Sequence, residues 1–151
     1  MEIRQSAQGA GAIRCAQKNN ETTFRVRYAE TDQMGVVYYA NYFVWMELGR
    51  VEYCRSIGMR YRDMEEQDGV LLAVIDAQCR YRRPARYDDE VTVRTWVGAS
   101  TRKAVEFSYE MYVREELIAS GRTKHLFLGR DFRPVSLPVK YRAMFGVRGR
   151  E

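Results

Sequence analysis

Residues 28–57 read YAETDQMGVVYYANYFVWMELGRVEYCRSI, and this stretch predicts how the rest of the chain folds. It bends at Asp32–Gly35 and then runs without a proline to Gly58, a residue typical of helix C-termini. A helix that is apolar on most sides has to be enclosed by other elements. The stretch therefore predicts one long, wrapped helix. Its apolar residues recur at helical spacing on more than one face, as Val44, Leu48 and Val51 and again as Phe43, Met46, Cys54 and Ile57.

The segments around this stretch have the patterns of β-strands. Polar and apolar residues alternate through most of them, which is typical of a sheet with one buried face. Glu115 and Glu116 separate two of them, so we expect an antiparallel hairpin there. One strand, one helix and a run of strands predict an α+β fold, in which an antiparallel five- to six-stranded sheet wraps around one long central helix. Strands are expected over 22–28, 70–83, 91–97, 104–114 and 117–128, with short helices over 59–67 and around Leu137, Tyr141 and Phe145.

The length of the chain limits its organisation. A chain of 151 residues suits one domain with a real core and little more. Residues 1–20 are polar and show no periodicity, which predicts a mobile N-terminal arm. We expect the folded domain over 21–134 and a C-terminal tail with a short helix over 135–151, because prolines at positions 134 and 138 interrupt the pattern.

Charge and cysteine content narrow the classes of partner. A net charge of +5 and a pI of about 9.2 favour an anionic partner such as nucleic acid, anionic lipid or a phosphorylated cofactor. The basic residues show no recognition-helix arrangement, which disfavours nucleic acid.

The longest apolar run, Val70–Ile75, is too short for membrane insertion, and no signal peptide is visible. Three cysteines without a CxxC pair indicate reduced thiols and a cytoplasmic protein.

The run TDQMGVVYYANYFVWME at 31–47 resembles the signature of the hydroxybenzoyl-CoA thioesterase family of hot-dog proteins. It is especially similar to the branch of short acyl-CoA thioesterases often encoded beside the Tol-Pal envelope system. Tyr39 departs from many members of that branch, which place a histidine there. The resemblance implies a hot-dog fold and a homodimer with a continuous sheet, commonly paired into a homotetramer, with active sites at the dimer interface. It rests on the spacing of Asp32, Gly35, Val36, Tyr39, Asn41 and Tyr42.

Asp32 is the carboxylate best placed for chemistry. It lies in a turn just before the helix, where unpaired N–H groups and the positive end of the helix dipole favour negative charge. By itself this placement also suits a capping aspartate. In the family that the motif resembles, the matching aspartate attacks a thioester carbonyl or activates a water that does so. A thiol with a pKa of about 8.5 leaves readily as its anion, so no separate general acid is required.

The developing oxyanion needs hydrogen-bond donors, and the backbone near Tyr38–Ala40 offers them. By resemblance, the N–H of Tyr39 is the best single donor. Gly35 either lets the chain approach the substrate closely or satisfies a turn with positive φ. The resemblance also places Val36 and Asn41 among the substrate-binding residues.

Other titratable residues give weaker signals. His125, the single histidine, lies in the last expected strand and is interpreted as a strand residue without a catalytic role. Histidine-dependent triads are thereby disfavoured, and one histidine with scattered cysteines provides no metal site. Glu47 and Arg50 are spaced for an ion pair on the helix. Glu47 is kept as a secondary site candidate.

Basic residues form a second group. CoA carries a pyrophosphate and a ribose phosphate, and arginine forks match phosphate oxygens in pairs. A solvated sheet rim is the alternative role for such residues. By resemblance, the CoA phosphates lie on the surface near strand turns. The residues expected to bind them are Arg82 and Arg83 at one strand end and Arg102 and Lys103 in the turn between the next two strands.

The sequence is thus interpreted as a cytoplasmic acyl-CoA thioesterase that works as a homo-oligomer and needs no cofactor, since coenzyme A is part of the substrate. The alternative is a non-catalytic protein that binds acyl thioesters on the same fold. A basic nucleic-acid binder is a weaker alternative. A hydratase is also a weaker alternative, because it requires an Asp–His pairing that the sequence does not provide. Turnover of a panel of acyl-CoAs separates the enzyme from the binding protein.

Overall fold

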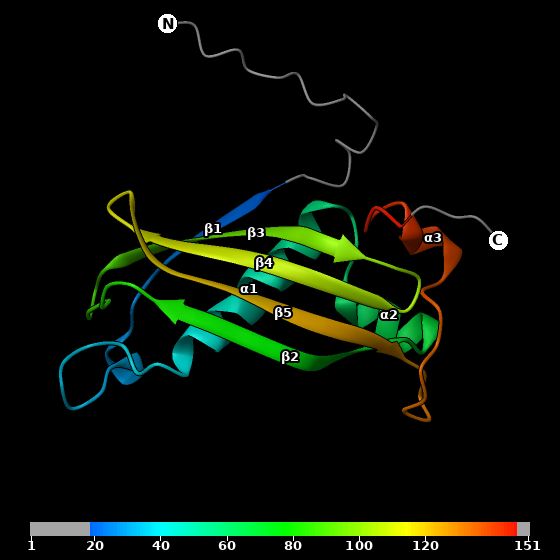
Figure 1. The fold of residues 1–151 in the computed structure, drawn as a ribbon, viewed down its shortest axis with the longest axis horizontal. Helices are drawn as coiled ribbons and strands as arrows, with labels where there is room; N and C mark the ends of the chain where they lie inside the picture. Colours follow the sequence, from blue (N-terminus) through cyan, green and yellow to red (C-terminus); the bar gives the residue numbers. More distant parts are fainter. Residues whose placement is uncertain (1–18, 148–151) are drawn as a thin grey trace, which may run out of the picture.

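The computed structural model describes residues 19–147, so most of the predicted N-terminal arm lies outside the described residues. Figure 1 shows a sheet of long strands with one long helix behind it. The elements in chain order are β1 (Asn20–Arg25), a 3-10 helix η1 (Tyr28–Glu30), α1 (Asn41–Ser56), α2 (Tyr61–Asp68), β2 (Leu71–Tyr81), β3 (Glu90–Ser100), β4 (Ala104–Val113), β5 (Glu116–Leu128) and α3 (Val139–Arg142).

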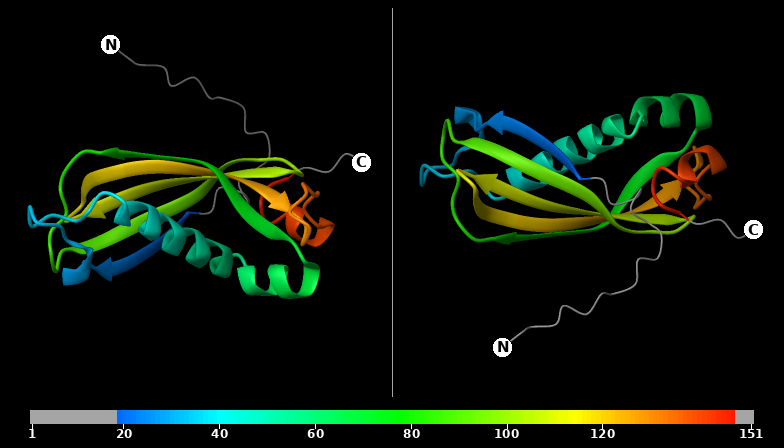
Figure 2. Two further views of the ribbon diagram at one scale, coloured as in Figure 1. Left: turned by 90° about the horizontal axis from the view of Figure 1, so that it is seen from below. Right: turned by 90° about the horizontal axis from the view of Figure 1, so that it is seen from above.

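The five strands form one antiparallel sheet in the order β1-β3-β4-β5-β2, which confirms the predicted fold. The two views of Figure 2 show α1 lying across one face of the curved sheet. Alternation along the strands decides which side chains meet the helix. On β4 the side chains of Val105, Phe107, Tyr109 and Met111 are buried, as the alternation predicted, whereas Val113, predicted on the same face, is half-buried.

Helix α1 approaches the sheet closely because Gly49 has no side chain. A Cβ atom at this position would lie 2.5 Å from Thr95 Oγ1 and 2.8 Å from Val93 Cγ1. The opposite face of α1 is not covered, since Val44 is 51% exposed and Leu48 is 37% exposed. The prediction that the helix is wrapped on most sides is therefore wrong for a single chain, in which the sheet encloses one face.

The predicted hairpin between β4 and β5 is confirmed, but its turn lies one residue earlier than expected. Val113 pairs with Glu116, so the two loop residues are Arg114 and Glu115. Both have positive φ, 50° and 65°, as a type I′ turn requires. Such turns prefer Asn and Gly, and the absence of that signal explains the misplaced turn.

Two further expectations are corrected at the ends of the fold. The first strand, expected over 22–28, is Asn20–Arg25, and Tyr28 belongs instead to η1 and is 77% exposed. The C-terminal segment up to residue 147 packs against the sheet. The Phe145 ring lies 6.1 Å from Phe107 and 6.3 Å from Phe127, so this part of the expected tail belongs to the core.

Candidate functional site

The candidate site is built on the loop between β1 and α1, and Glu30 holds this loop against the helix. The residue is 5% exposed. Its carboxylate accepts the Trp45 indole N–H at 2.7 Å and the Arg27 N–H at 2.9 Å, and its carbonyl accepts the Tyr38 N–H at 2.9 Å and the Asn41 amide at 2.8 Å. Burial raises the pKa of Glu30, but the hydrogen bonds to Arg27 and Trp45 outweigh it and the pKa is lowered. No pattern in the sequence indicated this role of Glu30.

Asp32 sits in a tight turn immediately after this anchor. The Asp32 N–H donates to the Val36 carbonyl at 2.8 Å, and the Gly35 N–H donates back to the Asp32 carbonyl at 2.9 Å. The Met34 N–H donates to Asp32 Oδ1 at 2.8 Å. Within residues 19–147, Asp32 Oδ2 has no hydrogen-bond donor. One carboxylate oxygen therefore fixes the turn, and the other remains available to a ligand.

Gly35 serves this turn through its backbone conformation. Its φ is +77°, in the region that side-chain-bearing residues rarely adopt. A Cβ atom built on Gly35 would meet no atom within 4 Å. Two roles for Gly35 were considered from the sequence, close approach to the substrate and a turn with positive φ. The structure of the single chain supports the turn with positive φ.

The start of α1 presents free backbone donors beside this turn. The chain enters the helix through hydrogen bonds from the Asn41 N–H to the Tyr38 carbonyl at 2.9 Å and from the Phe43 N–H to the Ala40 carbonyl at 3.1 Å. The Tyr38 N–H is already bonded to Glu30. In the described part of the chain, the N–H groups of Tyr39 and Ala40 have no acceptor. Free N–H groups at a helix start stabilise negative charge.

A depression of about 350 Å³ opens between this loop and the end of β2. Asp32 is the one carboxylate among its lining residues within the described part of the chain. The Tyr81 hydroxyl donates to the Tyr39 carbonyl at 2.8 Å, and its ring packs edge-on against Tyr42 at 4.9 Å. Tyr81 therefore ties the end of β2 to the start of α1. The lining residues are Asp32, Met34, Val36, Val37, Tyr39, Tyr42, Tyr81, Arg82, Arg83 and Pro84.

The structure brings together some of the residues expected to bind substrate and separates others. Val36, Arg82 and Arg83 line the depression with Asp32 and Tyr39. Asn41 instead donates its amide to the Glu30 carbonyl, which is a structural contact.

Arg102 and Lys103 lie in the β3–β4 turn, at the opposite end of the sheet from residues 31–40 in Figure 1. The 11 residues of β3 alone extend about 36 Å at ~3.3 Å per residue. Within one chain, these two residues therefore cannot contact a group held beside Asp32.

Comparison with known proteins decides the family. The profile of the thioesterase-like superfamily matches residues 26–145, which is most of the chain. The chain belongs to the thioesterase-like superfamily. A relative named "Putative acyl-CoA thioesterase YneP", from Bacillus subtilis strain 168, is 39% identical to this thioesterase over 112 residues, covering 73% of this chain and 80% of the relative.

Solved structures agree with this membership. A structure described as DHNA-CoA thioesterase from Staphylococcus aureus has 36% identity and a TM-score of 0.77, and the match covers 79% of this chain and 80% of that one. The hypothetical protein TT1821 from Thermus thermophilus has 37% identity and a TM-score of 0.79, with 82% and 95% covered. The curved sheet that packs on one face of α1 is thus the hot-dog fold of this family.

The other candidate groups of this thioesterase, His125, Glu47 and Arg50, are not among the lining residues of the depression. His125 is fully buried, and its Nε2 lies 2.7 Å from Thr123 Oγ1. Arg50 turns inward and donates to the Tyr109 hydroxyl at 3.1 Å, while Glu47 is exposed. The expected Glu47–Arg50 ion pair is therefore wrong, because Arg50 is hydrogen-bonded to Tyr109 and Glu47 stays exposed. Residues 19–147 contain no cluster of three or more His, Cys, Asp or Glu residues that could hold a metal ion.

No helix among the described residues is long and apolar enough to cross a membrane.

Proposed function

We propose that this thioester hydrolase cleaves an acyl-CoA to the free acid and CoA, with Asp32 as the reacting carboxylate. The observation that supports the proposal is the shared depression, whose lining includes both Asp32 and Tyr39, and the N–H of Tyr39 has no acceptor in the described part of the chain. Asp32 Oδ2 faces no competing donor in the described part of the chain. A carboxylate and oxyanion donors are what thioester cleavage requires of a site.

The proposed reaction starts with the thioester carbonyl oxygen at the N–H groups of Tyr39 and Ala40. Asp32 either attacks the carbonyl carbon and forms a mixed anhydride, or removes a proton from a water that attacks. As the C–O bond forms, negative charge develops on the carbonyl oxygen and is stabilised by the two N–H groups. The C–S bond then breaks, and the CoA thiolate takes a proton from solvent. In the first route, water hydrolyses the anhydride and restores Asp32.

Replacement of Asp32 by Asn tests the proposal. The Asn side chain keeps an oxygen that accepts the Met34 N–H, so the turn and the fold are preserved. We expect thiol release from a panel of short, long and aryl acyl-CoAs to fall by at least ~100-fold, the lower end of what a positioned acid or base contributes. Asp131→Asn is a matched control, because Asp131 also accepts an N–H two residues ahead, that of Arg133 at 3.1 Å, away from the depression. Equal turnover in the wild type and Asp32→Asn removes Asp32 from the mechanism.

Two further measurements complete this test. A single turnover in heavy-oxygen water tests the direct route: label on Asp32 and a protein oxygen in the first product molecule demonstrate direct attack followed by hydrolysis at the Asp32 carbonyl carbon. A wild type that binds acyl-CoA but hydrolyses none of the panel identifies a binding protein and ends the enzyme proposal.

We also propose that the protein works as a homodimer joined through β2, in the cytoplasm where acyl-CoA is available. β2 is one edge of the sheet, and its residues Val74 and Ile75 are 54% and 51% exposed. An apolar edge strand invites pairing with a second copy. Antiparallel pairing sets opposite ends of the two sheets side by side. This places Arg102 and Lys103 of one copy on the side of the Asp32 depression of the other.

The uncovered face of α1, with Val44 and Leu48, offers a second apolar surface through which dimers can pair into a tetramer. Light scattering at several protein concentrations distinguishes the dimer from the tetramer.

A further inference from the structure

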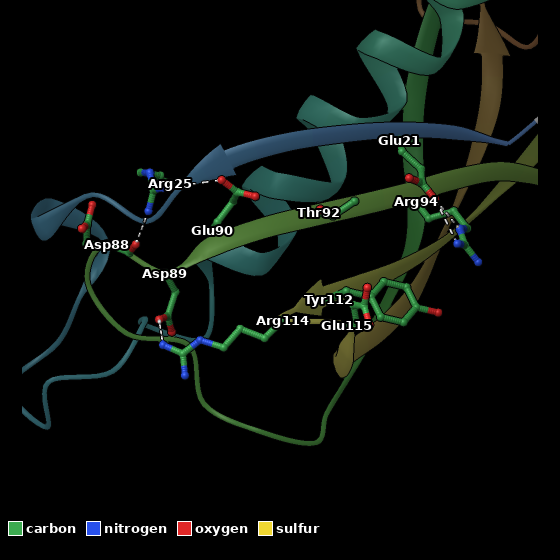
Figure 3. Close-up of a pocket in the computed structure, with 10 residues that line it drawn as sticks. All are labelled: Glu21, Arg25, Asp88, Asp89, Glu90, Thr92, Arg94, Tyr112, Arg114 and Glu115. Atoms are coloured by element: carbon green, nitrogen blue, oxygen red, sulfur yellow. Dashed lines mark hydrogen bonds and ion pairs between the residues drawn. The ribbon is translucent and has the colours of Figure 1, made fainter.

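Two large depressions on the outer face of the sheet differ in how their charges are balanced. The first, of about 620 Å³, is shown in Figure 3. Each arginine in it has a carboxylate: Arg94 lies 2.9 Å from Glu21, Arg25 lies 3.6 Å from Glu90, and Arg114 lies 3.9 Å from Asp89. Because its positive charges are already neutralised by the protein, this depression has no cation left for an anionic ligand.

The second depression, of about 600 Å³, contains three arginines without such partners. We call it the arginine pocket, defined by Arg80, Arg82 and Arg122. None of these guanidinium groups forms an ion pair with any residue from 19 to 147; Arg122 Nε donates to the Gln78 amide oxygen at 3.2 Å. The one carboxylate among the described lining residues is Glu110, so the formal charge of the lining is 3 − 1 = +2.

The strand register explains why these groups converge. Trp96 on β3 pairs with Ser108 on β4, Ser108 pairs with Arg122 on β5, and Arg122 pairs with Gln78 on β2. These residues therefore lie in one row across four strands, about 14 Å wide at ~4.8 Å per strand. Arg80 lies beside this row, opposite Ser120. The arginine pocket therefore brings together arginine side chains, serine hydroxyl groups and the half-buried indole of Trp96.

Arg82 connects this surface to the candidate site, because it lines both the arginine pocket and the depression that holds Asp32. We infer that the arginine pocket binds the phosphate groups of the CoA portion of the substrate while the thioester lies beside Asp32. Arginine forks bind phosphate oxygens in pairs, and an indole provides a stacking surface for a base such as adenine. This inference rests on the proposed function and adds Arg80, Arg122 and Trp96 to the substrate-binding residues.

Arg80→Gln and Arg122→Gln test the inference with two substrates that share one acyl group. The first is the benzoyl thioester of CoA, and the second is the benzoyl thioester of pantetheine, which lacks every phosphate. For the CoA thioester, we expect KM to rise about 5- to 30-fold per variant with kcat unchanged, the factor that one or two lost charge-assisted hydrogen bonds produce. For the pantetheine thioester, the kinetic constants of the variants should equal those of the wild type.

Arg114→Gln is the matched control, because it removes the same charge from the charge-paired depression of Figure 3. It should leave KM for benzoyl-CoA unchanged. Raised salt should increase the KM of the wild type for benzoyl-CoA and not for benzoyl-pantetheine, since screening weakens the phosphate contacts.

Three outcomes overturn the inference. The first is an unchanged KM for benzoyl-CoA in both arginine variants. The second is an equal loss of kcat/KM with both substrates, which means that the arginines act on the fold or the chemistry. A changed oligomer mass with unchanged KM means that another copy covers this face. These failures are distinct from failure of the proposed function, which would appear as wild-type protein that hydrolyses neither thioester.

Discussion

Acidification should destabilise this protein through His125 alone between pH 7 and pH 5. The side chain is fully buried against Phe107, with ring centroids 5.6 Å apart, and its Nδ1 has no hydrogen-bond partner within the described residues. Burial, assisted by the nearby positive charge of Arg50, lowers the pKa of His125 from 6.5 to about 3. It is the single histidine of the chain, so no other imidazole titrates in this range.

The direction of the effect follows from which state binds the proton. Below pH 6.5 the unfolded chain protonates its histidine and the folded chain does not, so the free energy of unfolding falls as pH falls. With these two pKa values, the loss is about 2 kcal/mol at pH 5 and about 4 kcal/mol at pH 3, at 1.36 kcal/mol per pKa unit. A loss of about 2 kcal/mol is a large share of a typical domain's stability.

Urea unfolding at pH 7, 6 and 5, followed by tryptophan fluorescence, measures this loss. His125→Gln is the matched variant, since an amide keeps a hydrogen bond to Thr123 and does not titrate. We expect the variant to start less stable at pH 7 and to lose little between pH 7 and pH 5. The carboxylate of Glu30, whose pKa is lowered from 4.5, contributes only at lower pH. Parallel pH dependence in the two proteins refutes the assignment to His125.

Three further predictions concern the helix, the site and the edge strand. Gly49→Ala should cost about 1–3 kcal/mol of unfolding free energy by thermal or urea denaturation, because its Cβ would lie 2.5 Å from Thr95 Oγ1. Tyr81→Phe removes the hydroxyl bonded to the Tyr39 carbonyl and should lower kcat about 5-fold, the value of one hydrogen bond, while Tyr87→Phe on the exposed surface should leave kcat unchanged. Ile75→Lys should convert the proposed dimer to a monomer in light scattering; an unchanged mass would place the interface elsewhere.

The parts of the fold that the sequence predicted are those specified by neighbouring residues. Helix α1 and the alternation of β4 follow from periodicity, and the turn at Asp32 follows from a short motif whose residues bond to one another. The β4–β5 hairpin was expected but its turn was misplaced by one residue. The Arg114–Glu115 pair carries positive φ without the glycine or asparagine that normally marks it.

The parts that sequence reasoning missed depend on contacts between distant residues. Tyr81 and Tyr39 are joined by a hydrogen bond although they are 42 residues apart in the sequence. Glu30 and Trp45 form a hydrogen bond only when the loop folds onto α1. Arg102 and Lys103, like Arg82 and Arg83, stand at strand ends in the sequence. The sheet places the two pairs at opposite ends, and nothing in local composition indicates which end holds the site.

The sequence places two carboxylates within three residues, and their surroundings give them different tasks. Glu30 is buried and accepts hydrogen bonds on both oxygens, from Arg27 and Trp45, so its charge is held by the protein and cannot approach a substrate. Asp32 is half-buried and accepts one N–H, that of Met34, on one oxygen. A carboxylate with all its charge compensated is a poor nucleophile or base, whereas one with a free oxygen beside unbonded amides is a good one. Glu30 therefore shapes the proposed site of Asp32: it accepts hydrogen bonds from Tyr38 and Asn41 and so holds the start of the helix, where the N–H groups of Tyr39 and Ala40 have no acceptor in the described part of the chain.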